Sequence, residues 1–120
     1  MEAENSDKGP NMDDTTSVGA LRDAVAAFIE QRNWEGYHTS KNLASSILIE
    51  AAELMEHFQW VKNDQGRMLL ADPVKKQKIA DELADVMIYT ISFANHAQID
   101  VSQAVLGKLK KNETRFPKAG

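Results

Sequence analysis

Two pairs of acidic residues are spaced so that their side chains could act together. Glu50 and Glu53 stand three positions apart in "EAAE", and Glu82 and Asp85 have the same spacing in "ELAD". On an α-helix, residues at i and i+3 have Cβ atoms about 5–6 Å apart. Each pair could therefore share one cation, and two such helices lying side by side would bring four carboxylates to one place.

Four carboxylates at short range repel one another unless a cation lies between them. Ligands that are all oxygen atoms favour a hard ion, Mg²⁺ with Mn²⁺ as a substitute, over zinc or copper. The alternative is that the acids are solvated, as charges at helical spacing usually are. A di-iron carboxylate bundle is a weaker prospect, because it uses Glu-x-x-His and neither acidic segment carries that motif.

The elements that must position these acids are predicted to be helices. Apolar residues recur with helical periodicity, and no strand-like alternation of any length interrupts it. Ser17 or Thr16, then Ser40 or Thr39, can cap the first two helices, and Pro73 suits the first turn of the third. The expected helices span about 17–33, 40–63, 73–98 and 100–116. Four helices with short connections predict an all-α, four-helix-bundle-like fold.

On helical wheels the acids lie at the border of the apolar face, not opposite it. Glu50 and Glu53 fall between the main apolar arc of the second helix and a further strip that includes Ile49 and Trp60. A single small bundle would leave such second strips exposed, and exposed apolar strips usually mark interfaces. We therefore expect the subunits to assemble into an oligomeric bundle.

Length and composition set the remaining limits. A chain of 120 residues suggests one domain at 17–117, with a disordered leader at 1–16 and a short tail at 118–120. The formal net charge of −4 argues against a nucleic-acid polymer as partner. The absence of cysteine excludes disulfides and thiolate sites. No apolar run approaches the roughly 18 residues of a membrane span, and the N-terminus has no signal-peptide pattern, so a cytoplasmic location is expected.

Taken in order, these motifs resemble the MazG-like all-α nucleoside triphosphate pyrophosphohydrolases. The family motif is Glu-x-x-Glu, a spacer, then Glu-x-x-Asp. The short dCTP pyrophosphatase branch resembles this chain most closely, over about residues 18–117. The further matches are "WEGYH" with Trp34 and His38, "KNL", "FQW" ending at Trp60, Asp85 with Tyr89, Lys108 with Asn112, and "RFP" beginning at Arg115.

The resemblance implies an enzyme that hydrolyses deoxynucleoside triphosphates, dCTP or a related one, to the monophosphate and pyrophosphate. It implies Mg²⁺ held by Glu50, Glu53, Glu82 and Asp85, with Glu50 or Glu53 as the general base. It also implies clearance of excess or modified nucleotides from the pool. By the same resemblance, the substrate-binding residues are Trp34, His38 and Trp60 for the base, Tyr89 for a phosphate, and Lys108, Asn112 and Arg115 for triphosphate or ribose.

Other interpretations stay open at this point. A lone tryptophan is more often a core or interface residue, and a loop histidine is more often at the surface; only the resemblance reverses these preferences. The family forms dimers and tetramers in which one subunit completes another's pocket, which predicts a homotetramer built as a dimer of dimers. The alternatives are the same chemistry on another base, such as dUTP, and a non-enzymatic helical module that keeps the acids for a structural ion or a basic partner.

Overall fold

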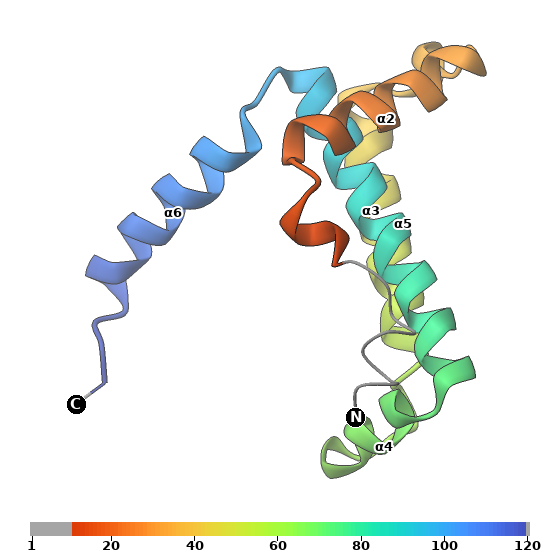
Figure 1. The fold of residues 1–120 in the computed structure, drawn as a ribbon, viewed down its shortest axis with the longest axis vertical. Helices are drawn as coiled ribbons and strands as arrows, with labels where there is room; N and C mark the ends of the chain where they lie inside the picture. The colour runs from red at the N-terminus through yellow and green to blue at the C-terminus, as the bar shows by residue number, and fades with distance from the viewer. Residues whose placement is uncertain (1–10, 120) are drawn as a thin grey trace.

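The structure, a computed structural model, describes residues 11–119, and its regular elements there are all helical (Figure 1). The prediction of an all-α fold is confirmed. Residues 1–10 of the predicted leader lie outside the described residues. The α-helices are α2 (Val18–Gln31), α3 (Ser40–Glu56), α4 (Gly66–Ala71), α5 (Pro73–Ala97) and α6 (Val101–Arg115), and the 3₁₀ turns are η1 (Met12–Asp14), η2 (Glu35–Tyr37) and η3 (Asn63–Gln65).

The helices begin where side chains can satisfy their first backbone N–H groups. Ser17 caps α2, Thr39 caps α3, Asp72 caps α5 and Asp100 caps α6, each by accepting a hydrogen bond from a backbone N–H in the first turn. Such caps stabilise a helix by about 1 kcal/mol each. The predicted starts of the four long helices are therefore confirmed, including Pro73 at the first position of α5.

The predicted end of the second helix is wrong. Helix α3 ends at Glu56, well before Asn63, because the hydrogen bonding changes there. The N–H of Phe58 bonds the carbonyl of Met55 at 2.9 Å, and that of Val61 bonds the carbonyl of Phe58 at 3.0 Å. These i→i−3 bonds close turns and do not continue the α-helix. The predicted connection also contains a short helix, α4, which the sequence did not indicate.

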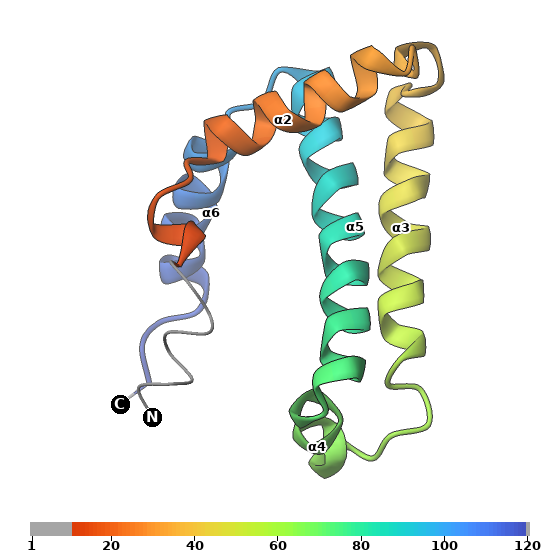
Figure 2. The ribbon, with the colours of Figure 1, turned by 45° about the vertical axis from the view of Figure 1, so that its right-hand side comes forward.

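Helices α3 and α5 pack side by side in opposite directions and form the main helix–helix interface of the chain (Figures 1 and 2). Leu43 of α3 and Ile79, Ile91 and Ala94 of α5 are buried. Helix α2 crosses the upper end of the pair, where its Ile29 is buried. This antiparallel hairpin of long helices carries both acidic motifs.

The corner between α5 and α6 is fixed to α2 by one arginine. Arg22 donates from Nε to Asn95 Oδ1 at 2.8 Å and from Nη1 to the carbonyl of Ile99 at 2.6 Å. Asn95 returns a bond from Nδ2 to the carbonyl of Arg22 at 3.1 Å. Gln98, with a left-handed φ of 56°, ends α5 between these contacts. The start of α6 is thus held near α2.

Beyond this corner, α6 runs away from the α3–α5 pair (Figures 1 and 2). Its large apolar residues are exposed, namely Val105, Leu106, Leu109 and the following Phe116. The chain exposes 10,009 Å², whereas a compact monomer of 13.4 kDa exposes about 6,500 Å². Within residues 11–119, one chain therefore does not close a four-helix bundle by itself.

Candidate metal centre

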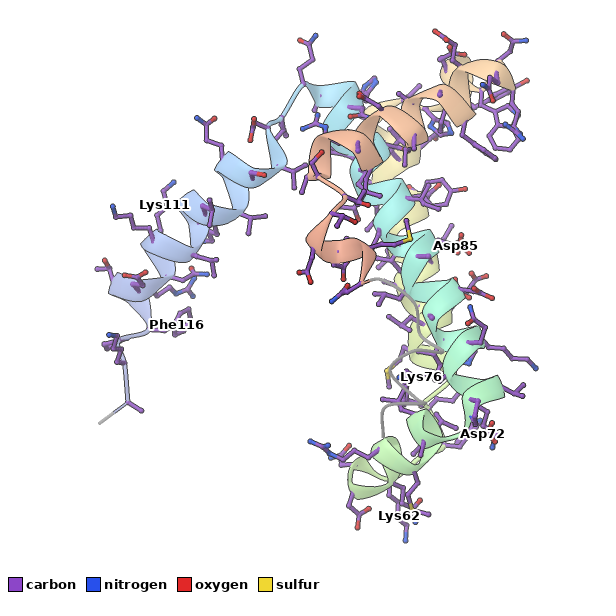
Figure 3. The ribbon with its side chains drawn as sticks, in the orientation of Figure 1. Lys62, Asp72, Lys76, Asp85, Lys111 and Phe116 are labelled. Atoms are coloured by element: carbon purple, nitrogen blue, oxygen red, sulfur yellow. The ribbon has the colours of Figure 1, made fainter. Side chains whose placement is uncertain are left out.

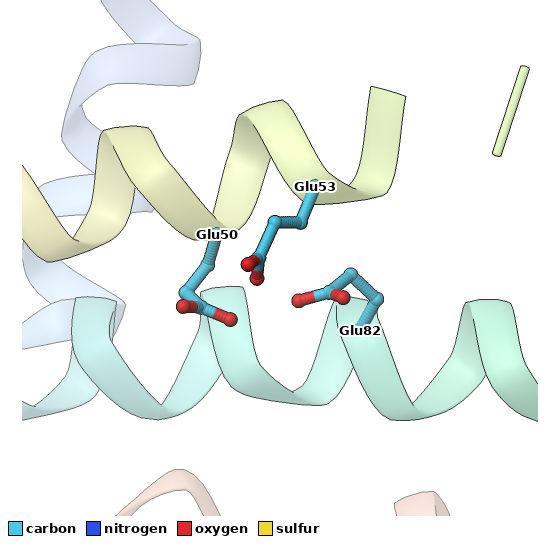
Figure 4. A group of neighbouring side chains, drawn as sticks. All are labelled: Glu50, Glu53 and Glu82. Carbon is cyan, nitrogen blue, oxygen red and sulfur yellow. The ribbon is translucent and has the colours of Figure 1, made fainter. Parts of the chain in front are cut away.

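Three carboxylates meet between α3 and α5. Glu50 and Glu53 extend from α3 toward α5, and Glu82 extends from α5 toward them (Figure 4). One oxygen of each side chain lies within 4.8 Å of the oxygens of the other two, and all three residues are half-buried. The structure thus brings together three of the four acids that the sequence singled out.

Asp85 does not join this group of three. It is exposed and lies one turn beyond Glu82 on α5 (Figure 3). The contact between Ser40 Oγ and His96 Nε2, at 3.0 Å, sets the register of the antiparallel pair. In that register Glu82 is level with Glu53, and Asp85 is level with Glu50. The backbone of Asp85 is therefore beside the cluster, and its role as a fourth ligand stays a prediction.

The cluster raises the pKa of Glu50 from 4.5 to about 7. Hydrogen bonding with the Glu82 carboxyl is the largest cause, followed by the loss of hydration on burial and by the carboxyl and charge of Glu53. Each of these disfavours the ionised form. At neutral pH Glu50 in the metal-free cluster is therefore about half protonated, whereas an isolated glutamate would be ionised.

One oxygen of the cluster has no partner. Glu82 Oε2 is buried and makes no hydrogen bond within the described residues, although buried polar atoms are nearly always satisfied. A divalent cation would satisfy this atom and remove the repulsion that raises the pKa of Glu50. The donors are all carboxylate oxygens, which Mg²⁺ and Mn²⁺ prefer. The residues present therefore fit a hard divalent cation.

A cavity of about 270 Å³ lies near the upper end of the α3–α5 pair. Val25, Ala26 and Ile29 of α2 form an apolar wall, while His38, Ser92 and Asn95 contribute polar groups. Tyr89 lies between this cavity and the acidic cluster along α5, and its ring centroid is 6.3 Å from that of His38. Of the predicted substrate residues, His38 therefore lines the cavity, and Tyr89 lies beside His38 without being one of the lining residues.

The loop that carries His38 is anchored to α3. Asn42, from the "KNL" motif, donates from Nδ2 to the carbonyl of Tyr37 at 3.1 Å. Trp34 packs edge-to-face on Phe28, with ring centroids 5.6 Å apart, and Arg32 stacks on the same Phe28 ring at 3.6 Å. Trp34 is thus held in an aromatic and cationic cluster at the start of the loop and is not one of the residues lining the cavity.

The remaining predicted substrate residues lie elsewhere in the chain. Trp60 follows α3 and is 88 % exposed, whereas His38 precedes α3, whose 17 residues span about 25 Å. Lys108, Asn112 and Arg115 lie on α6, which runs away from the acidic cluster, as the positions of Lys111 and Phe116 show (Figure 3). Their roles toward a nucleotide stay predictions.

Comparison with known sequences identifies the family. The sequence profile of the MazG-like family matches residues 45–119, which include both acidic motifs. This chain belongs to the MazG-like family. The resemblance read from the motifs is therefore confirmed.

The MazG-like chain has relatives with named activities. It is 33 % identical over 97 residues to proteins named dCTP pyrophosphatase 1 from Bos taurus and Homo sapiens. Each alignment covers 81 % of this chain and 57 % of the relative, so the chain spans little more than half the length of these proteins. A solved pyrophosphatase from Archaeoglobus fulgidus is 42 % identical, with a TM-score of 0.76 over 82 % of this chain and 90 % of that one.

The sequence analysis missed Ser92 and Asn95, which line the cavity. A signal for Ser92 was present, because it continues the i+3 and i+4 spacing of Glu82, Asp85 and Tyr89 on one face of the third helix. The apolar wall from α2 had no comparable signal, since its position depends on how α2 crosses α5.

Proposed function

We propose that this MazG-like chain is a divalent-cation-dependent nucleoside triphosphate pyrophosphohydrolase. The observation that carries the proposal is the convergence of Glu50, Glu53 and Glu82, with an unsatisfied buried oxygen on Glu82. The names of the relatives support hydrolysis of dCTP or a related deoxynucleoside triphosphate to the monophosphate and pyrophosphate.

Glu50, Glu53 and Glu82 would hold Mg²⁺, with Asp85 completing the donor set and Mn²⁺ able to substitute. When bound, the cation supplies charge neutralisation at the phosphate oxygens during in-line displacement. A water attacks the α-phosphorus, the bond from that phosphorus to the bridging oxygen breaks, and pyrophosphate leaves. Glu50 and Glu53 are the two candidates to accept the proton of the water.

The cavity near His38 is the proposed site of the nucleoside. Glu82 and Ser92 are ten residues apart on α5, which separates the cluster from the cavity by about 15 Å along the helix axis. An extended nucleotide with its phosphates at the cluster would pass Tyr89 and place its base against His38. This arrangement gives Tyr89 the phosphate-contacting role predicted from the sequence.

Other substrate residues would come from a second copy of the chain. Lys108, Asn112 and Arg115 lie on α6, which runs away from the α3–α5 pair in one chain, and Trp60 is exposed beyond the end of α3. The exposed apolar face of α6 needs a partner, and its basic residues complement the acids of another subunit and the charge of a triphosphate. We propose a homotetramer, a dimer of dimers, in which these residues complete the site, with Trp34 and Trp60 near the base.

The test is pyrophosphate release from the four dNTPs, dUTP and 5-methyl-dCTP, with Mg²⁺, with Mn²⁺ and with EDTA. The expected result is cation-dependent release that is fastest with dCTP or its 5-methyl form. Fastest release from dUTP would keep the reaction and change the base. No release by folded protein from any of these substrates would overturn the proposal.

The acidic cluster would also suit a non-enzymatic helical module with a structural ion. The two functions differ in what stabilises the folded protein, since any ligand specific to the folded state raises Tm. The enzyme is expected to gain Tm from a non-hydrolysable dCTP analogue in the presence of Mg²⁺. A rise with Mg²⁺ alone and none with the analogue would favour the module.

Location and cellular role also stay predictions. Within residues 11–119, none of the helices combines the length and the apolar character needed to cross a bilayer. A cytoplasmic location and the clearance of excess or modified nucleotides are proposed from the sequence and from the family.

A further inference from the structure

Ser92 is buried on α5 with a hydroxyl that has no partner. Only 5 % of the residue is exposed, and its Oγ makes no hydrogen bond within the described residues. A buried hydroxyl without a partner costs roughly 1–3 kcal/mol, so its presence calls for a reason. Ser92 lines the 270 Å³ cavity that also contains His38, and a change of its χ1 rotamer would turn the hydroxyl toward a ligand there.

The two other polar side chains that α5 contributes to the cavity have partners in the protein. Both side-chain atoms of the Asn95 amide bond Arg22, at 2.8 and 3.1 Å. The Nε2 of His96 is 3.0 Å from Ser40 Oγ. Among the polar side chains from α5 that line this cavity, Ser92 is therefore the one that makes no hydrogen bond within the described residues.

The cavity suits a small, flat and partly polar ligand. Its volume is close to the lower end of the range for ligand pockets, about 300–1,000 Å³, which favours one aromatic ring over two. It has an apolar wall from Val25, Ala26 and Ile29 and an imidazole ring from His38, which can pack on the faces of a base. Such a ligand needs a hydrogen-bonding partner for its polar edge.

We propose that Ser92 Oγ hydrogen-bonds the polar edge of a pyrimidine base and so contributes to base recognition. The proposal rests on the proposed function, in that the acidic cluster holds the phosphates of the same ligand. A hydroxyl both donates and accepts, so Ser92 serves an amino or a carbonyl group on the base. It does not reach the reacting phosphorus, about 15 Å away along α5, and it is a specificity residue.

A role toward the ligand predicts a distinctive effect on stability. In the ligand-free protein, Ser92→Ala removes a buried hydroxyl that has no partner, which is neutral or stabilising. We expect Tm to stay the same or to rise by about 2–5 °C. A serine that served only the packing of α5 would show the opposite, a loss of stability without any change in affinity for a base.

The test is binding of dCMP to the whole chain, measured by calorimetry with Mg²⁺ present. Because dCMP is the monophosphate product of the proposed reaction, no turnover accompanies binding. Ser92→Ala is expected to weaken dCMP binding about tenfold and to leave binding of deoxyribose 5-phosphate, which lacks the base, unchanged. Ser45→Ala is the matched control, because Ser45 is an exposed serine on α3. Purine dAMP is expected to bind more weakly than dCMP to the wild type.

The outcomes separate this proposal from the proposed function. Normal pyrophosphate release together with equal dCMP affinity in wild type and Ser92→Ala overturns the role of Ser92 and leaves the reaction standing. No pyrophosphate release, but dCMP binding that depends on Ser92, overturns the reaction and supports the base site. A wild type that binds no dCMP, or a Ser92→Ala variant that is less stable with unchanged affinity, overturns the role of Ser92.

Discussion

The α3–α5 hairpin and helix α6 both carry charged residues suited to a nucleotide and its cation, yet only the hairpin gathers them. Leu43 and Ile79 bury apolar surface between α3 and α5, and this packing brings Glu50, Glu53 and Glu82 within 4.8 Å of one another. Helix α6 has an apolar face of its own, but that face has no partner among the described residues of one chain. Packing within the chain thus forms the acidic half of the site, and the basic half depends on assembly.

The largest effect is expected in the hairpin. Glu53→Gln keeps the shape of the side chain but removes the charge that would bind the cation. We expect turnover to fall by at least about 10²–10³-fold, the scale for removing one electrostatic stabiliser, while far-UV circular dichroism stays unchanged. Glu56→Gln is the control, because Glu56 is exposed on the same helix. Full activity in Glu53→Gln would contradict the proposed metal centre.

Asp85→Asn tests the fourth acid in the same assay. Asp85 lies level with Glu50 but outside the group of three. If it is the fourth ligand, its loss is expected to lower the affinity of the centre for the cation. We expect turnover to be abolished at physiological Mg²⁺ and partly restored at high Mg²⁺. Unchanged activity would limit the centre to three carboxylates.

The second-largest loss of activity is expected from a substitution in α6. Leu109→Glu places a charge on the exposed apolar face that we propose to be an interface, and a buried unpaired charge is strongly destabilising. The expected result is dissociation to smaller species in analytical ultracentrifugation and a loss of activity of about 10²-fold. Thr114→Glu, on the opposite face of α6, is the control. A wild type that is monomeric and fully active would show that the site forms within one chain and would contradict the composite site.

The sequence predicted the hairpin better than it predicted the arrangement around it. Caps such as Ser17 and Thr39, and the acids at i and i+3, are local features, and the structure places them as expected. The end of α3 at Glu56 depended on a change to i→i−3 bonding that helical periodicity does not reveal. The separation of Trp60 from His38 depends on where helices cross, which spacing along one helix cannot indicate.

A smaller effect is expected from Trp60, which is 88 % exposed in one chain. An exposed side chain contributes little to the stability of its own chain, whereas an aromatic ring stacked on a base contributes about 1–3 kcal/mol. Trp60→Ala is therefore expected to lower kcat/KM for dCTP about tenfold or more, with Tm nearly unchanged. Tyr37→Ala, another exposed aromatic residue, is the control and is expected to have no effect on kcat/KM. Equal kcat/KM for Trp60→Ala and wild type would remove Trp60 from the base site.

The smallest expected effect is the pH dependence of stability and of cation affinity, which again distinguishes the α3–α5 hairpin from α6. The pKa of Glu50 is about 7 in the folded protein, against 4.5 for an isolated glutamate side chain. Between these values the unfolded chain has lost a proton that the folded protein keeps, so the stability of the metal-free protein falls as pH rises from about 4.5 to about 7. Cation binding requires the ionised carboxylate and releases that proton. Mn²⁺ affinity is therefore expected to rise about tenfold from pH 6 to pH 8, as the ionised fraction of Glu50 rises.

Calorimetry at pH 6, 7 and 8 in buffers of different ionisation enthalpy measures both the affinity and the proton release. Glu50→Gln is expected to remove the proton release and to flatten the pH dependence of stability, because the neutral amide cannot titrate. Lys111→Gln on α6 is the matched control and is expected to leave both unchanged, since Lys111 is not among the α6 residues that we propose to complete the site. If Lys111→Gln shifted the pH dependence as much as Glu50→Gln, the titration would not be specific to the cluster, which would contradict its assignment to Glu50.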